Sequence, residues 1–395
     1  MNPLKALLDL TVGEKEERGL LHTPHEITQQ SATWKTTWNL FEQRLPEIQA
    51  FLIRAGLHGP IAMRPIIYLV GAGTSDYIGQ CLHHILRQRW QCEVEAVSST
   101  SLLVEFSERV LKDRPYLWIS FSRSGDSPEG VAVLQRALAE EPQISHLVVS
   151  CNASGKMTQM IAGKDNCLSI VLGKETNDQG LAMTSSFTNM VVFGQALAHT
   201  WSADEYAPLV ESMCTAADSF LPIAAKMAMT LAELDYKRAC FIGSSALAGV
   251  AQESALKLLE LTAGKVKTMS QTTLGLRHGP MAALDQETLF ITFLSTENAR
   301  QRYEIDLLLE VERKGLVGAS IAVIGCGSPL PPEIEGIQVL APTSHWNVPD
   351  LYRPALDVLF GQTLGLFFSL HIGLTPDSPS PNGAISRVVQ PIEIY

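Results

Sequence analysis

Short, almost wholly apolar runs of five or six residues alternate along this chain with longer segments whose apolar positions recur at helical spacing. Apolar runs without an alternating polar face are typical of parallel strands that helices cover on both faces. The pattern therefore predicts an α/β fold built on doubly wound parallel sheets. Because ligands of such sheets bind beyond the carboxyl ends of the strands, the residues that follow each strand are the first candidates for a site.

The predicted strands occur twice, in the same order and at nearly the same separation. In each copy a first strand runs into a small-residue turn and then into a helical pattern, and two further apolar strands follow. The corresponding pairs are 67–71 and 239–243, 117–122 and 289–294, and 147–151 and 322–326. The sequence thus predicts two tandem copies of one α/β domain.

The limits of the domains follow from where the strand pattern stops. We expect an N-terminal helical arm over 1–45, α/β domains over 46–205 and 220–375, and a tail over 376–395 that closes on the site. A helix over 201–228 is expected to link the two halves. The tail begins rich in Pro, Ser and Gly and is expected to turn strand-like toward its end.

Composition excludes several classes of protein. The chain has 395 residues, of which 46% are hydrophobic and 18% charged, as expected for two domains with their own cores. A formal net charge of −11 argues against nucleic acid or an anionic membrane as the main partner. The most apolar long stretch, 355–374, is interrupted by Asp357, Gln362 and His371, which favours a buried helix over a membrane span.

The cysteines and the N-terminus indicate the compartment. Seven widely spaced cysteines without a Cys-x-x-Cys pair suggest neither a disulfide framework nor a zinc site. The N-terminal stretch lacks the cationic lead and small-residue cleavage site of a secretory signal. We expect a cytoplasmic protein.

The strand that ends at Phe121 opens into Ser-Arg-Ser-Gly-Asp-Ser, residues 122–127, and Ser127-Pro128-Glu129 is a strong helix start with a hydroxyl N-cap. Backbone N–H groups, the positive end of a helix and several hydroxyls are offered there to an anion. The candidate phosphate ligands are Ser122, Arg123, Ser124 and Ser127, joined by Gly73, Thr74 and Ser75 from the turn after the first strand.

Serine-rich turns between a strand and a helix are also common structural caps, so spacing alone leaves both interpretations open. A Walker loop is excluded by the missing Gly-Lys-Ser/Thr, and Asp76 stands where the dinucleotide pattern requires its third glycine. The second copy has Leu-Ser-Thr-Glu-Asn-Ala over 294–299 at the equivalent place, without such a loop. The two copies have therefore diverged in task.

In the second copy, Glu253, Lys257 and Glu260 are spaced i, i+4, i+7 and share one face of a predicted helix. The opposing, core-facing stripe consists of Ala255, Leu258, Leu259 and Thr262. A solvated salt-bridge face explains the charged spacing, and so does enolisation, in which a carboxylate removes a proton beside a carbonyl and an ammonium stabilises the oxyanion.

His278, in Leu276-Arg-His-Gly-Pro280, lies in a predicted turn where an imidazole can move a ring-opening proton at neutral pH. An isolated His-Gly-Pro turn is also a common structural element. The sequence has no His-x-x-x-His or clustered Asp/His pattern, so we expect proton transfer without a metal.

These residues together resemble the SIS (sugar isomerase) superfamily from about residue 45 to the end, which implies flavodoxin-like domains. Residues 122–127 look like the phosphate loop in the isomerase half of glucosamine-6-phosphate synthase, and 251–260 look like its catalytic helix. The resemblance implies Glu260 as the base between C1 and C2, supported by Lys257 and Glu253. It further implies His278 in ring opening across a dimer interface.

The resemblance extends to two other segments. Residues 178–186 take the place of a substrate-lining loop, which implies Thr184 and Ser185 as ligands. Arg387 stands where the synthase tail has a lysine that reaches the sugar, and because arginine is a poor Schiff-base amine we assign it to binding only. No glutaminase domain or nucleophilic cysteine lies near the start, so synthesis from glutamine is not expected.

The whole pattern looks most like the AgaS group of tagatose-6-phosphate ketose/aldose isomerases and galactosamine-6-phosphate deaminases. This implies conversion of galactosamine 6-phosphate to tagatose 6-phosphate and ammonia in amino-sugar catabolism, without a cofactor, by a homodimer or tetramer with a shared active site. A plain aldose/ketose isomerase or a fructosamine-phosphate deglycase is the alternative enzyme. A non-catalytic sugar-phosphate sensor is the alternative of another class.

Overall fold

The computed structural model describes the whole chain except residues 1, 326–330, 343–347 and 391. It divides into two compact units. The first-repeat unit comprises 32–178, 185–210 and 386–395, and the second-repeat unit comprises 1–31, 179–184 and 211–385. Neither unit is a continuous stretch of sequence. The predicted ranges 46–205 and 220–375 therefore describe the two sequence repeats, and as domain limits they stay a prediction.

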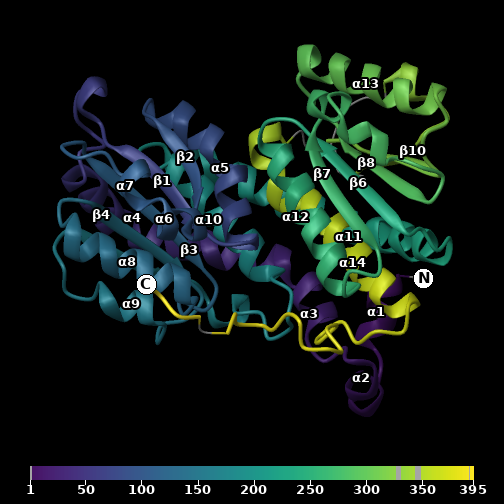
Figure 1. Cartoon of the computed structure of the whole chain (residues 1–395), viewed down its shortest axis with the longest axis horizontal. Helices are drawn as coiled ribbons and strands as arrows, with labels where there is room; N and C mark the ends of the chain where they lie inside the picture. The colour runs from purple at the N-terminus through teal and green to yellow at the C-terminus, as the bar shows by residue number, and fades with distance from the viewer. Residues whose placement is uncertain (1, 326–330, 343–347, 391) are drawn as a thin grey trace. The chain divides into compact units, whose positions relative to one another are not determined.

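The first-repeat unit contains a five-stranded parallel sheet in the order β2-β1-β3-β4-β5 (Figure 1). Its strands are β1 (Ile66–Gly71), β2 (Val94–Ser98), β3 (Tyr116–Ser122), β4 (Ser145–Ser150) and β5 (Cys167–Val171). Every residue of β1, β3 and β4 is buried, as their unbroken apolar character predicted. The strand order reverses between β1 and β3, which is where ligands of doubly wound sheets bind.

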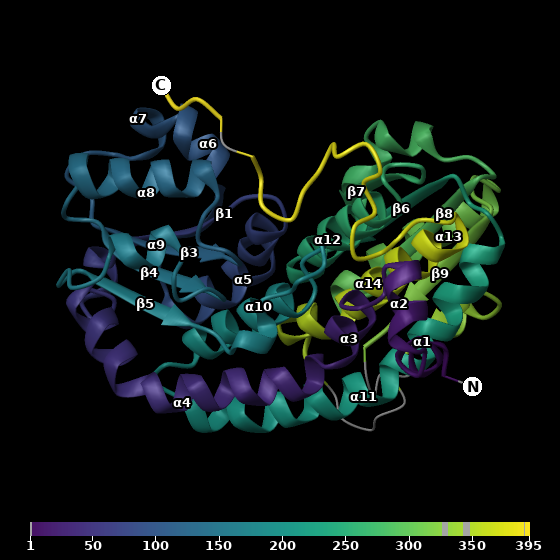
Figure 2. The same cartoon turned by 90° about the horizontal axis from the view of Figure 1, so that it is seen from below.

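Helices cover both faces of this sheet (Figure 2). One face carries α5 (Thr74–Trp90), α10 (Ser185–Ala198) and α4 (Gln30–Arg54), and the other α6 (Ser99–Val104), α7 (Phe106–Arg109), α8 (Pro128–Glu140) and α9 (Lys156–Met160). A Cβ on Gly194 of α10 would lie 2.1 Å from Cδ1 of Leu82 on α5, so glycine permits the close approach of these two helices.

The second-repeat unit contains a parallel sheet in the order β10-β9-β8-β6-β7, the same order relative to its own repeat. Its strands are β6 (Arg238–Gly243), β7 (Lys267–Thr272), β8 (Thr288–Phe293), β9 (Ala319–Val323) and β10 (Gln338–Leu340). The predicted duplication and the fold class of two doubly wound parallel-sheet domains are confirmed.

One face of the second sheet carries α12 (Ala246–Leu261), against which α14 (Pro354–His371) packs. The other face carries α13 (Asn298–Arg313), whose Leu307 and Leu308 join Ile242 and Phe290 in one core cluster. The apolar stretch expected to be a buried helix is α14, and all its residues from Pro354 to Ser369 are buried. Among the described residues, no helix has both the length and the apolar character needed to cross a membrane.

The predicted N-terminal helices and linking helix are present. The helices are α1 (Pro3–Leu8), α2 (Val12–Arg18), α3 (Thr23–Thr28) and α11 (Ala203–Glu233). The described tail residues form no strand; instead, Asp377 accepts hydrogen bonds from the amides of His22 and Thr23 at 3.0 and 2.7 Å. The six described cysteines are free, and Cys326 lies outside the described residues.

Short 3-10 helices complete the secondary structure. They span Ile61–Met63, Lys174–Thr176, Leu274–Arg277, Pro280–Ala283, Pro332–Ile334 and Asp350–Tyr352.

Candidate active site

The serine-rich loop after β3 is closed by its own hydroxyls. The Oγ atom of Ser122 accepts a hydrogen bond from the amide of Gly125 at 3.0 Å, and that of Ser124 accepts one from the amide of Asp126 at 3.1 Å. Gly125 has a positive φ of 69°, which favours glycine. The loop is therefore a compact turn at the carboxyl end of a central strand.

The segment after β4 supports this loop from one side. The side chain of Asn152 donates to the carbonyl of Ser124 at 2.8 Å, and the carboxylate of Asp126 accepts from the amide of Lys156 at 3.0 Å. Asn152 is not among the residues predicted from the sequence. The signal that could have found it is the polar Ser-Cys-Asn ending of the next strand, because neighbouring parallel strands end at the same edge of a sheet.

Ser127 precedes α8 in the predicted N-cap position, but its side chain makes no cap hydrogen bond. The prediction of a hydroxyl N-cap is therefore wrong in this respect. Gly130, in the first turn of α8, leaves space beside the Ser127 Oγ atom, because a Cβ on Gly130 would lie 2.7 Å from that atom. The first-turn amides of α8 are thus not taken by a side-chain cap and remain suited to an anion.

The turn after β1 reaches the same edge, since β1 and β3 are neighbours in the sheet. Gly73 has a φ of 55°, and Thr74 and Ser75 are buried at the start of α5. A Cβ on Gly71 would lie 2.2 Å from the carbonyl carbon of Ser75, so the helix start packs directly on the strand end. The predicted residues of both turns therefore gather at the switch point of the first sheet.

Asp76, which the sequence analysis used only to exclude a dinucleotide pattern, lies in the first turn of α5. Its Oδ1 atom is buried and has no hydrogen-bond partner among the described residues. Burial raises the pKa of this carboxyl to about 6. A carboxyl of this kind beside a candidate ligand turn is a further candidate for contact with a polar substrate.

The tail residue Arg387 joins the serine-rich loop after β3 to the loop before α10. Its guanidinium donates to the carbonyl of Asp178 and to the side chain of Asn177, both at 2.7 Å, and its own carbonyl accepts from the side chain of Arg123. Arg123 is buried. The side chain of Arg123 therefore contacts the backbone of Arg387, and both residues belong to the first-repeat unit.

Thr184 and Ser185, expected to line the substrate, are fully buried. The carboxylate of Asp178 accepts from the amides of Ser185 and Ser186 at 3.0 and 2.9 Å and so caps α10. The carbonyl of Thr184 accepts from Gln362 at 3.4 Å within the second-repeat unit.

The second-repeat unit holds the predicted acid–base residues on α12. The Nζ atom of Lys257 lies 3.3 Å from Glu253 Oε1 and 2.6 Å from Glu260 Oε2. The side chains of Glu253 and Lys257 are fully buried, whereas that of Glu260 is 22% exposed. A solvated salt-bridge face is thereby excluded for the first two residues, and Glu260 is the member of the triad that reaches the surface of the chain.

Burial opposes the charge of Lys257, but the adjacent carboxylates of Glu253 and Glu260 outweigh it and raise the pKa of the ammonium above its usual value. The arrangement therefore keeps a permanent cation beside Glu260.

Two glycines of α14 allow this helix to lie close to α12. A Cβ on Gly361 would lie 2.7 Å from the Cα of Ser254, and one on Gly365 would lie 2.9 Å from the carbonyl oxygen of Lys257. Neither contact can be relieved by turning a side chain, because both involve backbone atoms. The position of the triad is thus set by a helix more than a hundred residues away in sequence.

His278 is exposed and lies between the 3-10 helices Leu274–Arg277 and Pro280–Ala283, as the predicted turn requires. The preceding Arg277 donates to Glu310 of α13 at 3.0 Å, which attaches the turn to the second-repeat unit. Among the described residues, no group of three His, Cys, Asp or Glu side chains could hold a metal ion.

Comparison with known proteins places the chain among sugar-phosphate enzymes. The D-galactosamine-6-phosphate deaminase AgaS of Escherichia coli O157:H7 is 35% identical over 334 residues, which cover 83% of this chain and 85% of that protein. The protein of the same name from Shewanella sp. ANA-3 is 32% identical over 98% of this chain and 95% of its own.

Solved structures agree with these sequence relatives. The tagatose-6-phosphate ketose/aldose isomerase of Escherichia coli superposes with a TM-score of 0.83 and 30% identity, covering 90% of this chain and 95% of that one. No protein-family model matches the chain.

Proposed function

Because this chain belongs to the AgaS family of phosphosugar isomerases and deaminases, we propose that it converts galactosamine 6-phosphate to tagatose 6-phosphate and ammonia. The observation that carries the proposal is the triad on α12. Two of its charges are fully buried, and the third, Glu260, is kept accessible beside a permanent ammonium. Burying charges is costly, and an arrangement of this kind is typical of acid–base catalysis.

In this proposal the loop over 122–127 and the first turn of α8 bind the phosphate group. The absence of a side-chain cap on α8 supports this assignment, because the N-terminal amides of a helix favour an anion. Thr74 and Ser75, at the same edge of the first sheet, supply further donors. Arg123 and Arg387 add positive charge to the same unit.

The reaction begins with opening of the sugar ring, to which His278 contributes the proton transfer. Glu260 then removes the proton from C2 of the open-chain aldehyde, which gives an enolamine, and returns a proton to C1. The C2 imine that results is hydrolysed by one water molecule to the ketose and ammonia. Lys257 stabilises the negative charge that develops during enolisation, and Glu253 holds Lys257 in place.

We also propose that the active protein is a cytoplasmic homodimer in which His278 of one chain serves the other. The exposure of His278 supports this assignment, because a residue that serves a neighbouring chain must lie at the surface of its own. Equilibrium sedimentation, together with mixing of two separately inactive variants, Glu260→Gln and His278→Ala, tests it. Recovery of activity in the mixture is expected if the sites are shared.

The substrate assignment is tested by incubating the protein with galactosamine 6-phosphate and with glucosamine 6-phosphate and measuring ammonia and ketose together. Equal amounts of ammonia and tagatose 6-phosphate from the galacto sugar are expected. Ketose formation from aldose phosphates without ammonia would instead identify a plain aldose/ketose isomerase. Glu260→Gln is expected to lower kcat by at least about a thousandfold and to leave phosphosugar binding intact.

A further inference from the structure

The second sheet has its own loop at the switch point, after β8, in the place that the phosphate loop holds after β3. Residues 294–297 form this loop, and α13 begins directly after it, as α8 follows the first loop. A strand, a short polar loop and a helix start are thus repeated in the second-repeat unit. The two loops differ in what fills them.

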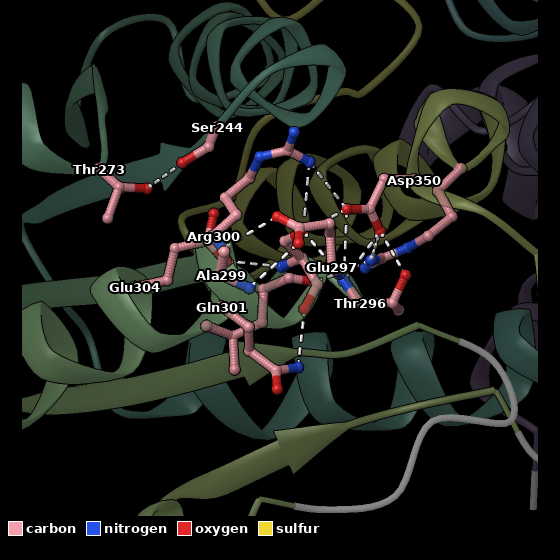
Figure 3. Close-up of polar contacts among 12 residues, drawn as sticks. Ser244, Thr273, Thr296, Glu297, Ala299, Arg300, Gln301, Glu304 and Asp350 are labelled. Carbon is pink, nitrogen blue, oxygen red and sulfur yellow. Dashed lines mark hydrogen bonds and ion pairs between the residues drawn. The ribbon is translucent and has the colours of Figure 1, made fainter.

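The carboxylate of Asp350 receives the donors of the second loop (Figure 3). The amide and the hydroxyl of Thr296 donate to its Oδ1 atom at 3.0 and 2.9 Å, and the hydroxyl of Ser295 donates to Oδ2. Two guanidinium groups complete the set: Arg353 lies 3.0 Å from Oδ1 and Arg300 lies 3.2 Å from Oδ2. An amide, two hydroxyls and two arginines are the donors with which proteins bind phosphate.

Asp350 is fixed in this position as an anion. Its exposed fraction is 7%, and burial alone would raise the pKa of its carboxyl. The charge of Arg353 and the hydrogen bonds from Ser295 and Thr296 outweigh burial and hold that pKa below its usual value. Negative charge is therefore what this group of donors requires.

Two further carboxylates accept from other amides of the loop and the helix start. Glu297 caps α13 by accepting from the amides of Ala299 and Arg300 at 3.1 and 3.0 Å, and Glu304 accepts from the amide of Ser295 at 2.6 Å. In the first-repeat unit, by contrast, the side chain of the N-cap residue Ser127 makes no hydrogen bond to the start of α8. The first loop leaves its helix start to an external anion, and the second is closed by the chain itself.

We propose that residues 294–297, with Arg300 and Arg353, form an oxyanion-binding cradle of the same kind as the phosphate loop, and that Asp350 occupies it as a built-in ligand. Removal of the Asp350 carboxylate opens the cradle to an external oxyanion, namely phosphate, sulfate or a small carboxylate such as formate. Taken together with the proposed function, this leaves the first loop as the phosphosugar site of each native chain. The second sheet is left to carry the triad of α12.

The test is the Asp350→Ala variant of the full chain, unfolded by heat in sodium phosphate, sulfate, formate or chloride at equal ionic strength. We expect a lower melting temperature than wild type in chloride and a recovery of about 3 °C or more at 50 mM oxyanion, beyond the shift that the same anion causes in wild type. The partly exposed Asp285, which pairs with Arg238 at 2.6 Å in the same unit, provides the matched control. Asp285→Ala is expected to show no extra oxyanion effect.

A second variant and a second measurement guard against a failure to fold. Asp350→Asn keeps a side chain of the same shape in the cradle, so it is expected to lose stability without gaining an oxyanion response. If Asp350→Ala is too unstable to melt, its soluble yield after refolding from urea is expected to rise several-fold in phosphate over chloride. Equal behaviour in chloride and in every oxyanion overturns the proposal. Enzymatic turnover is not read in this test, so the result is independent of the proposed reaction.

Discussion

The Nζ atom of Lys257 lies 2.6 Å from Oε2 of Glu260, although the Lys257 side chain is fully buried. Its other carboxylate neighbour, Glu253, is buried as completely. A cation in this environment is stable only because both carboxylates compensate its loss of hydration. The triad is therefore one electrostatic unit, and replacing a single member is expected to lower the stability of the protein.

Replacing Lys257 by Met is expected to lower the free energy of unfolding by about 3 to 5 kcal/mol, because it leaves the carboxylate of Glu253 buried without its cation. The double variant Lys257→Met with Glu253→Gln is expected to recover part of that loss while remaining inactive. Urea denaturation followed by circular dichroism measures both. A double variant no more stable than the single one would show that the two charges do not compensate each other.

Replacing Gly365 by Ala is expected to reduce stability by about 1 to 3 kcal/mol and to lower kcat. The added Cβ would lie 2.5 Å from Cδ1 of Leu261 and 2.9 Å from the Lys257 carbonyl oxygen, so α14 must move away from the triad. Gly13→Ala in α2 is the control, because nothing lies within 4 Å of that Cβ. The control is expected to be neutral or to stabilise by up to about 1 kcal/mol. If both substitutions changed kcat equally, the distance between α12 and α14 would not matter for catalysis.

Replacing Gly130 by Ala tests the phosphate loop without removing a donor. The new Cβ would lie 2.7 Å from the Ser127 Oγ and would reduce the space for an anion at the start of α8. We expect KM for the phosphosugar to rise about five- to tenfold, with kcat little changed, as for a group that binds substrate and transition state equally. The melting temperature is expected to be maintained, since alanine is the better helix former. An unchanged KM would speak against phosphate binding at this helix start.

His146 predicts a sensitivity to acid. It is fully buried, its ring lies 5.5 Å from that of Trp118, and neither ring nitrogen has a hydrogen-bond partner among the described residues. Burial lowers the pKa of His146 to about 4, whereas the unfolded chain takes up the proton near 6.5. The stability that depends on neutral His146 is therefore present above pH 6.5 and is lost as the pH falls toward 4.

The variant His146→Leu is expected to lose less stability than wild type between pH 7.5 and pH 5, by about 2 kcal/mol. Urea denaturation at the two pH values measures the difference. The exposed His25 supplies the control, and His25→Gln is expected to follow the wild-type pH dependence. Identical pH dependence of His146→Leu and wild type would contradict the assignment.

Much of the fold could be predicted from the order of residues. The apolar runs at 117–122 and 289–294 indicated buried parallel strands, because only a strand covered on both faces lacks a polar side. The observed β3 and β8 fall within a residue of both limits, and the sheet orders repeat as the duplication required. The described residues of the tail form no strand, because a strand-like sequence does not by itself supply a partner strand.

The site could be predicted only in part. Helical spacing was sufficient to place Glu253, Lys257 and Glu260 on one face, because the period of a helix does not depend on its surroundings. That two of these charges are buried and one is accessible could not be predicted, since burial depends on which helix packs against that face. Here it is α14, brought close by Gly361 and Gly365.

The repeated parallel domains and the serine-rich turn of one copy could be predicted from the sequence alone, because hydrophobic period and turn chemistry are local properties. The closure of the other copy by Asp350 is seen only in the folded protein, because Asp350 lies more than fifty residues beyond Thr296 in sequence and 2.9 Å from its hydroxyl in space. The two segments come together only through the fold of the domain, so no local pattern in the sequence could predict this hydrogen bond.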